Sequence, residues 1–134
     1  MAIMTFCTHT IFEDGASLKL AGVLQSLGIK NPLLCTDSGL NQSGMVDQLL
    51  AGLGDIFPTS VFDQTPANPT EEAVEQASRQ YKEMGCDGVV ALGGGSSMDL
   101  AKAVALAVTH AEPLLSYTAG LGGMSKIREV APLV

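Results

Sequence analysis

Two kinds of apolar pattern alternate along the chain: short continuous runs, and longer stretches in which apolar residues recur at helical spacing. The short runs predict strands at residues 2–6, 10–12, 31–37, 56–63 and 87–92, and the start of another at 131–134. The helical spacing predicts helices at residues 15–28, 38–53, 68–85 and 96–110. Strands that alternate with helices indicate an α/β fold with an open, mostly parallel sheet and helices on both faces.

Several of the predicted helix ends are marked by capping residues. Asn68 is predicted to be the N-cap of the third helix, with Pro69 in the first helical position and Glu71 where a capping-box carboxylate belongs. Gly28 and Gly85 are predicted to end the first and third helices, because glycine readily adopts the left-handed conformation that commonly follows a helix.

The last third of the chain contains its most buried elements. The strand at 87–92 is apolar on both faces, as a central parallel strand should be, and the helix at 96–110 is apolar almost all round. Residues 118–126 are glycine-rich and predict a flexible loop. A domain rarely ends on the first residues of a core strand, so the run at 131–134 predicts a fragment that stops before the last strands of its sheet.

Three glycines, Gly93, Gly94 and Gly95, lie between the strand at 87–92 and the following helix. In an open α/β sheet, the loop that leaves the carboxyl end of a strand lines the crevice where ligands bind. Residues without side chains let a ligand approach the backbone, and the unpaired N–H groups at a helix start attract an anion. This arrangement predicts a cradle for a pyrophosphate.

The same stretch also has a purely structural interpretation. A tight turn would place Ser96 at the N-cap of the helix, with Asp99 as its capping-box partner. The stretch is neither a G-x-G-x-x-G motif nor a P-loop, because no G-K-[ST] follows and Lys102 lies too far along the helix. From the glycines alone, anion binding and a plain capped turn both stay open.

A carboxylate follows an earlier predicted strand. Asp37 comes directly after residues 32–36, where it could accept hydrogen bonds from ribose hydroxyls, favouring NAD and repelling a 2′-phosphate. A standard dinucleotide-binding motif places the glycine loop first and the acid about 20 residues later, whereas here the order is reversed. By pattern alone, Asp37 could equally cap the helix that follows it.

Composition and charge narrow the function classes. The 134 residues carry a net charge of −7, which argues against nucleic acid and anionic membranes, since both need clustered Lys and Arg. No signal-peptide pattern is present, and no apolar run approaches the roughly 20 residues of a membrane span, so we expect a cytoplasmic protein. Cys7, Cys35 and Cys86 form no C-x-x-C pair and are expected to be buried reduced thiols.

The stretch "GGGSSMDLAK" resembles the glycine-rich signature of the iron-containing, or group III, alcohol dehydrogenases. Residues 33–53 are similar to that family's second strand and helix, and residues 61–77 are similar to its N-P-T segment. The resemblance implies that residues 1–134 are a Rossmann-like dinucleotide-binding domain. It also implies that the family's helical, metal-binding domain lies outside this sequence.

The resemblance implies roles for individual residues at the glycine loop. Gly94, Gly95, Ser96 and Ser97 would receive the pyrophosphate of NAD through backbone N–H groups and a hydroxyl. Asp37 would face the adenosine ribose, which points to NAD over NADP.

Other residues of the matching motifs have less definite roles. Asp99 would lie near the cofactor, where it holds the loop or meets the nicotinamide end, and Asn68 would lie near the crevice. Lys102 belongs to the motif without a firm chemical role. His9 and His110 match no metal ligand of the family and are expected to be ordinary surface or helix-end residues.

The reaction that the resemblance implies is reversible hydride transfer between a small alcohol, or its aldehyde, and NAD. A divalent metal, iron or zinc, acts as Lewis acid on the alcohol oxygen, but its ligands lie outside this chain, which we expect to be inactive alone. The alternatives are a fragment of a glycerol dehydrogenase or dehydroquinate synthase, and a stand-alone, non-catalytic nucleotide-binding module. We expect a homodimer, and either dimerisation or strand addition could cover the exposed sheet edge.

Overall fold

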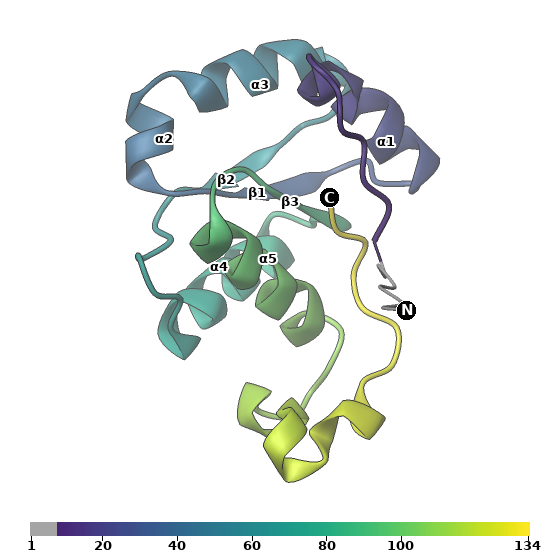
Figure 1. The fold of residues 1–134 in the computed structure, drawn as a ribbon, viewed down its shortest axis with the longest axis vertical. Helices are drawn as coiled ribbons and strands as arrows, with labels where there is room; N and C mark the ends of the chain where they lie inside the picture. The colour runs from purple at the N-terminus through teal and green to yellow at the C-terminus, as the bar shows by residue number, and fades with distance from the viewer. Residues whose placement is uncertain (1–7) are drawn as a thin grey trace, which may run out of the picture.

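The computed structural model describes residues 8–134 and places a parallel sheet between two layers of helices (Figure 1). The strands within these residues are β1 (Pro32–Cys35), β2 (Ser60–Phe62) and β3 (Gly88–Ala91). They pair in the order β2-β1-β3, and Leu33 of the central strand lies opposite both Ser60 and Val89. The predicted α/β fold with a parallel sheet is confirmed.

The end of the chain extends this sheet beside β3. The backbone N–H of Val89 donates to the carbonyl of Pro132 at 2.8 Å, and the N–H of Ala91 donates to the carbonyl of Val134 at 2.8 Å. The bridge between Val89 and Leu133 is parallel. The last residues therefore pair in parallel with β3, as predicted, although Pro132 is exposed and Leu133 and Val134 are only half-buried.

Helices connect the strands and cover both faces of the sheet. The α-helices are α1 (Leu20–Ser26), α2 (Ser38–Gln42), α3 (Met45–Leu53), α4 (Glu71–Glu83) and α5 (Gly95–Ala107). In Figure 1, α1 and α3 lie on one side of the strands, and α4 and α5 lie on the other. No helix in the described part of the chain is long and apolar enough to cross a membrane.

Two separate cores result, because successive side chains of a strand point to opposite faces. Leu33 and Cys35 of β1, with Val89 of β3, pack toward α4 and α5. Leu34 and Val90 pack toward α1 and α3. Fully or almost fully buried partners complete the first core (Ala77, Leu100, Ala101, Val104) and the second (Leu24, Ile29, Val46).

The structure corrects three of the predicted elements. The helix predicted at 38–53 is two helices, because Gly44 adopts a left-handed conformation, with φ of 83°, between α2 and α3. The weak strand predicted at 10–12 does not form, and the strand predicted at 2–6 lies outside the described residues. The helix predicted at 15–28 begins as a 3-10 turn, Ala16–Lys19, before α1.

The start of α4 also differs from the prediction. Its N-cap is Thr70, whose hydroxyl accepts a hydrogen bond from the N–H of Ala73 at 3.2 Å. Asn68 is exposed before the helix, and Glu71 is the first helical residue rather than a capping-box partner. The helix starts later than predicted because Thr70, which is extended and accepts the N–H of Ala73, takes the N-cap position in place of Asn68.

We expect the mutation Thr70→Ala to lower the free energy of unfolding by about 1 kcal/mol, because it removes the side-chain acceptor at the start of α4. Asn68→Ala should change the stability by less than about 0.5 kcal/mol, as for an ordinary surface substitution. Urea unfolding of the two variants measures the difference. An equal loss in both would show that Asn68, not Thr70 alone, caps the helix.

The predicted ends of α1 and α4 are confirmed. Gly28 and Gly85 have φ of 72° and 64°, the left-handed conformation that allows a helix to end without strain. The cysteines in the described residues are free, with Cys35 buried and Cys86 half-buried, whereas Cys7 lies outside those residues.

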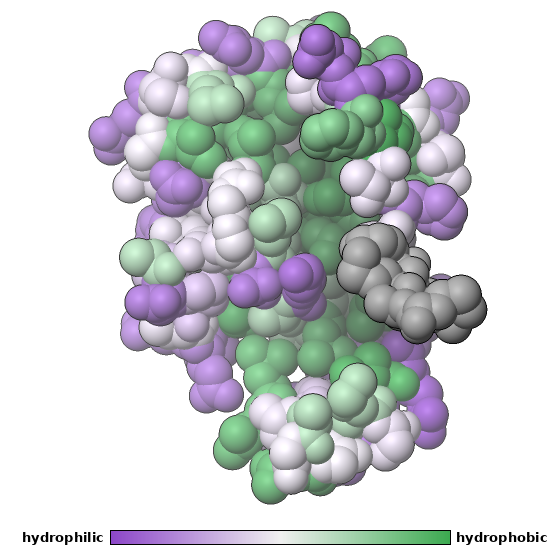
Figure 2. Space-filling view, viewed as in Figure 1, coloured by the Kyte–Doolittle hydropathy of each residue, from purple (hydrophilic) through white to green (hydrophobic). Residues whose placement is uncertain are grey.

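Residues 111–126 form a small lobe beyond the end of α5, at the bottom of Figure 1. The loop predicted at 118–126 contains two short 3-10 turns, Ala119–Leu121 and Gly123–Lys126. Figure 2 shows this lobe as a mixture of white and green surface, and its exposed large apolar side chains are those of Leu115, Leu121 and Met124.

His110 joins this lobe to α5, and it is a helix-end residue as predicted. Its Nε2 atom accepts the backbone N–H of Arg128 at 2.9 Å, and its Nδ1 atom lies 3.0 Å from the carbonyl of Leu106. The ring packs edge-on against Tyr117, with 5.1 Å between the ring centroids. Both ring nitrogens therefore have polar partners within the fold.

Candidate functional site

The carboxyl ends of the parallel strands meet at one edge of the sheet, and three loops leave it. The first runs from β1 through Asp37 into α2, the second from β2 through residues 63–70 into α4, and the third from β3 through the glycines into α5 (Figure 1). In open α/β sheets, this edge is where ligands bind.

The glycines of the third loop differ in their surroundings. Gly93 has φ of 146°, and a Cβ atom there would lie 2.6 Å from Oγ of Ser97. At Gly94 and Gly95 a Cβ would meet no atom within 4 Å. Gly93 is therefore required by the backbone and by packing, whereas Gly94 and Gly95 leave open space in front of the helix.

The N-terminus of α5 faces this space without a side-chain cap. The helix is 13 residues long, Gly94 is its N-cap, and no side chain among the described residues hydrogen-bonds there. The first N–H groups of a helix have no partner within it, and they carry the positive end of the helix dipole. Such an end can bind an anion through backbone atoms alone.

The alternative of a plain capped turn is therefore wrong. Ser96 lies inside α5, not at its N-cap, and its hydroxyl donates to the carbonyl of Ala67 at 2.5 Å. Asp99 does not hold the loop, because it pairs with Nζ of Lys102 at 3.1 Å on the exposed side of the helix. The cap moves to Gly94 because that residue is extended and Gly95 is already helical.

The serines of the loop present different groups to the edge. Ser97 is 1% exposed and packs directly beneath Gly93, so its hydroxyl is not available at the surface. Ser96 is half-buried, and its hydroxyl already donates the hydrogen bond that joins α5 to the 63–70 segment, called the Ser96 latch below. A ligand at this helix start would meet backbone N–H groups, with at most one hydroxyl beside them.

Asp37 caps α2, one of the two roles that its position in the sequence left open. Its Oδ1 atom accepts the N–H of Leu40 at 3.0 Å. The residue is half-buried, and its second carboxylate oxygen makes no hydrogen bond with the described residues. Capping therefore leaves one carboxylate oxygen of Asp37 able to accept a hydrogen bond from a ligand.

A second carboxylate at this edge was missed from the sequence. Asp63 directly follows β2, and its Oδ2 atom accepts a hydrogen bond from Nδ2 of Asn41 at 2.6 Å. The available signal was the repeated pattern of an apolar run that ends in aspartate, "LLCTD" and "SVFD". Asn41 lies on α2, one helical turn after Asp37, so the two carboxylates belong to one local arrangement.

Asn68 lies on the segment that the Ser96 latch holds. It is exposed, and it directly follows Ala67, whose carbonyl accepts the hydrogen bond from Ser96. The same segment is anchored at Thr65, whose N–H donates to the carbonyl of Thr36 at 3.2 Å. The structure thus brings Asn68 close to the start of α5, away from any capping role.

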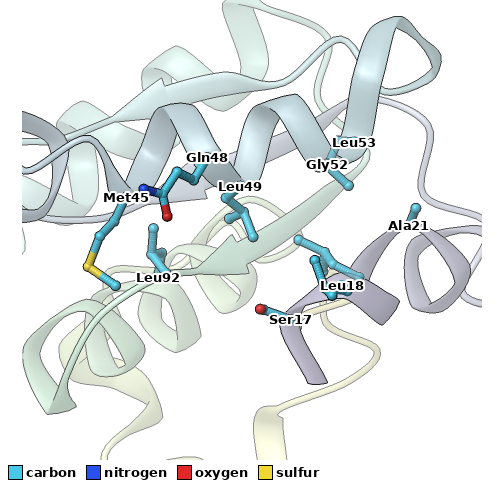
Figure 3. A pocket seen from close by; sticks show the side chains of 10 residues that line it. Ser17, Leu18, Ala21, Met45, Gln48, Leu49, Gly52, Leu53 and Leu92 are labelled. Atoms are coloured by element: carbon cyan, nitrogen blue, oxygen red, sulfur yellow. The ribbon is translucent and has the colours of Figure 1, made fainter. Parts of the chain in front are cut away.

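A small apolar pocket lies beside the edge, between α1 and α3 (Figure 3). Its volume is about 190 Å³, and the side chains of Met45, Leu49 and Leu18 point into it around Leu92, which directly precedes the glycine loop. The polar side chains in its lining are those of Ser17 and Gln48. The uncapped start of α5 can bind a charged cofactor through its N–H groups, whereas this lining is mostly apolar.

Among the described residues, no group of three or more His, Cys, Asp or Glu side chains is arranged to hold a metal ion. The chemistry available at the edge is hydrogen bonding by backbone N–H groups and by carboxylates.

Comparisons with known proteins agree with the fold. The family model described as iron-containing alcohol dehydrogenase matches residues 7–134. The 4-hydroxybutyrate dehydrogenase of Cupriavidus necator is 42% identical over 135 residues, which cover 100% of this chain and 35% of that protein. The NAD-dependent methanol dehydrogenase of Bacillus methanolicus is 27% identical over 126 residues, covering 93% of this chain and 32% of that protein.

A solved structure also superimposes on this fold. The crystal structure of a 1,3-propanediol oxidoreductase aligns with a TM-score of 0.73 and 34% identity, over 77% of this chain and 27% of that chain. The chain thus spans about a third of the length of the curated relatives named above.

Proposed function

The chain belongs to the iron-containing alcohol dehydrogenase family, and from this premise we propose that its carboxyl edge binds NAD within an enzyme that transfers hydride between a small alcohol and that cofactor. When bound, NAD supplies the hydride acceptor, while the protein binds and orients it. The observation that carries the proposal is the uncapped start of α5 behind Gly94 and Gly95, where backbone N–H groups face open space.

The pyrophosphate is proposed to lie in front of α5, on the N–H groups of Gly95, Ser96 and Ser97. The absence of side chains at Gly94 and Gly95 gives a diphosphate room to reach these groups. The hydrogen bond from Ser96 to Ala67 joins the neighbouring segment to α5, so we expect the cradle to be formed before the ligand arrives.

The adenosine ribose is proposed to lie against Asp37, whose second oxygen can accept from a ribose hydroxyl while the first caps α2. A carboxylate accepts hydrogen bonds from the two hydroxyls of NAD but repels the 2′-phosphate of NADP. Asn68 is proposed to line the crevice from the other side.

Asp99 and Lys102 are proposed to form an electrostatically neutral pair beside the phosphates. An isolated carboxylate next to a phosphate is unfavourable. The 3.1 Å contact with Lys102 offsets the charge of Asp99 and gives the lysine a role that the sequence motif did not reveal.

The remaining parts of the proposal concern the whole protein. We propose that residues 1–134 are the dinucleotide-binding part of a cytoplasmic, homodimeric enzyme that acts on a small alcohol, hydroxy acid or the corresponding aldehyde. The 42% identical relative acts on 4-hydroxybutyrate, which favours the hydroxy-acid branch of this substrate class. Metal-dependent chemistry would need ligands beyond the described residues.

Calorimetric titration of the chain with NAD, NADP and ADP-ribose tests the cofactor site. We expect NAD and ADP-ribose to bind and NADP to bind more weakly. We expect Gly95→Val to lower the affinity for NAD at least tenfold, because the valine side chain fills the space in front of the helix without a clash inside the fold.

Gly22→Val is the matched control, since Gly22 is another exposed helical glycine with open space around its Cβ position, and it lies on α1. The control should bind NAD as the unmodified chain does. If neither NAD nor ADP-ribose binds, or if folded Gly95→Val keeps full affinity, the proposed function is wrong.

A further inference from the structure

We propose that Asp63, positioned by Asn41, is a second residue that selects NAD against a dinucleotide with a 2′-phosphate. This inference rests on the proposed function, since it assumes that the adenosine ribose lies at Asp37. Its basis is the 2.6 Å hydrogen bond between Nδ2 of Asn41 and Oδ2 of Asp63, which joins the loop after β2 to the helix that Asp37 caps.

The strand register places Asp63 one position before Asp37 at the same edge of the sheet. Cys35 of β1 lies opposite Phe62 of β2, and the N–H of Thr36 donates to the carbonyl of Phe62 at 2.9 Å. Asp37 and Asp63 therefore follow the ends of adjacent parallel strands, which lie about 4.8 Å apart. Continuing the register, Asp63 lies opposite Thr36, the residue before Asp37, and its hydrogen bond to Asn41 joins it to the helix that Asp37 caps.

Asn41 fixes where the second charge lies. It is in α2, and its backbone N–H donates to the carbonyl of Asp37 at 3.1 Å, while its side chain donates to Asp63. Asp63 is half-buried, so its carboxylate has few other positions to occupy. The hydrogen bond uses one carboxylate oxygen and leaves the negative charge in place.

The surrounding sequence offers a 2′-phosphate no compensating cation. Residues 36–44 and 60–70, which form the two loops at this part of the edge, contain no Lys or Arg. A phosphate monoester carries about −1.5 to −2 charges at neutral pH. Carboxylates repel such a group effectively over distances up to the screening length, which is about 8 Å at physiological salt.

The test compares the ratio of NADP to NAD affinity in the unmodified chain, in Asp63→Asn and in Asp37→Asn, by calorimetric titration. Asp63→Asn keeps the shape of the side chain and an oxygen for Asn41 but removes the charge. We expect the affinity ratio to shift toward NADP by roughly tenfold, as for one charge interaction near a protein surface. Asn is also a good N-cap, so Asp37→Asn should preserve α2.

Two controls separate a charge effect from a structural one. Asp55→Asn removes the same charge from the exposed turn after α3, away from the carboxyl edge, and should leave the ratio unchanged. The shift in Asp63→Asn should shrink as salt is raised from 50 mM to 500 mM, since screening weakens repulsion but not packing. Thermal unfolding shows whether each variant is folded.

The outcomes distinguish this inference from the proposed function. If NAD binds and folded Asp63→Asn leaves the ratio unchanged, Asp63 plays no part in selection and only this inference is wrong. If neither dinucleotide binds the unmodified chain, the proposed function and the inference are overturned together.

Discussion

Replacing Gly93 with alanine should lower the free energy of unfolding by roughly 2–4 kcal/mol, which combines backbone strain with an overpacked contact. At φ of 146° a non-glycine residue is strained, and its Cβ would lie 2.6 Å from Oγ of Ser97 and 3.3 Å from Cδ1 of Leu40. Ser97 is 1% exposed and has no room to move aside. Urea unfolding, followed by circular dichroism, measures the loss.

Gly95→Ala is the matched control for this effect. The same methyl group there meets nothing within 4 Å, and the residue is already helical, so the stability should change by less than about 1 kcal/mol. Equal destabilisation by the two substitutions would contradict the division of the loop into a structural glycine, Gly93, and the pair Gly94 and Gly95, which we propose to face the ligand.

The three glycines form one run in the sequence, and the pattern alone does not distinguish their roles. A run of glycines between a buried strand and a helix predicts a ligand-facing loop, because few other structures need such flexibility at that place. Which glycine carries the positive φ depends on the packing of Ser97 and Leu40 beneath the loop. That packing is fixed only once the helix has docked on the sheet.

The parts of the fold that follow from hydrophobic periodicity were predicted well. The runs that form β1 and β3 are apolar on both faces because helices cover both, and the final residues of the chain do pair with β3. The helix boundaries were less accurate. Thr70 and Asn68 are both good N-caps, and competition between them is decided by differences of about 1 kcal/mol or less.

Only part of the candidate site could be predicted from the sequence, for a related reason. The glycine loop and Asp37 could be identified from their position after a strand, since strand ends gather at one edge in any parallel sheet. The pair of Asn41 and Asp63 joins residues 22 positions apart, and it depends on the register between β1 and β2. The break at Gly44, which the helical pattern hides, also sets how α2 leaves the sheet.

Raising the pH above 9 should destabilise the protein through Cys35, by up to about 4 kcal/mol at pH 12. Burial raises the pKa of this thiol from 9.0 to about 12, with a smaller contribution from Cys86. A pKa that is higher in the folded state means that the folded protein keeps the thiol neutral. The stabilisation is therefore fully present below pH 9 and is lost between pH 9 and 12, as the unfolded chain ionises first.

The measurement is the free energy of urea unfolding at half-unit steps from pH 8 to 11, for the unmodified chain and for Cys35→Ala. The variant should be less stable at pH 8, because it leaves a small cavity in β1, but its stability should fall less steeply with pH. The slopes should differ by up to about 1.4 kcal/mol per pH unit above pH 9. Burial also raises the pKa values of Tyr81 and Cys86. These two groups therefore lower the stability of both proteins as the pH rises. Parallel curves would therefore show that Cys35 does not titrate as a buried thiol, and that the α4/α5 side of the sheet admits water.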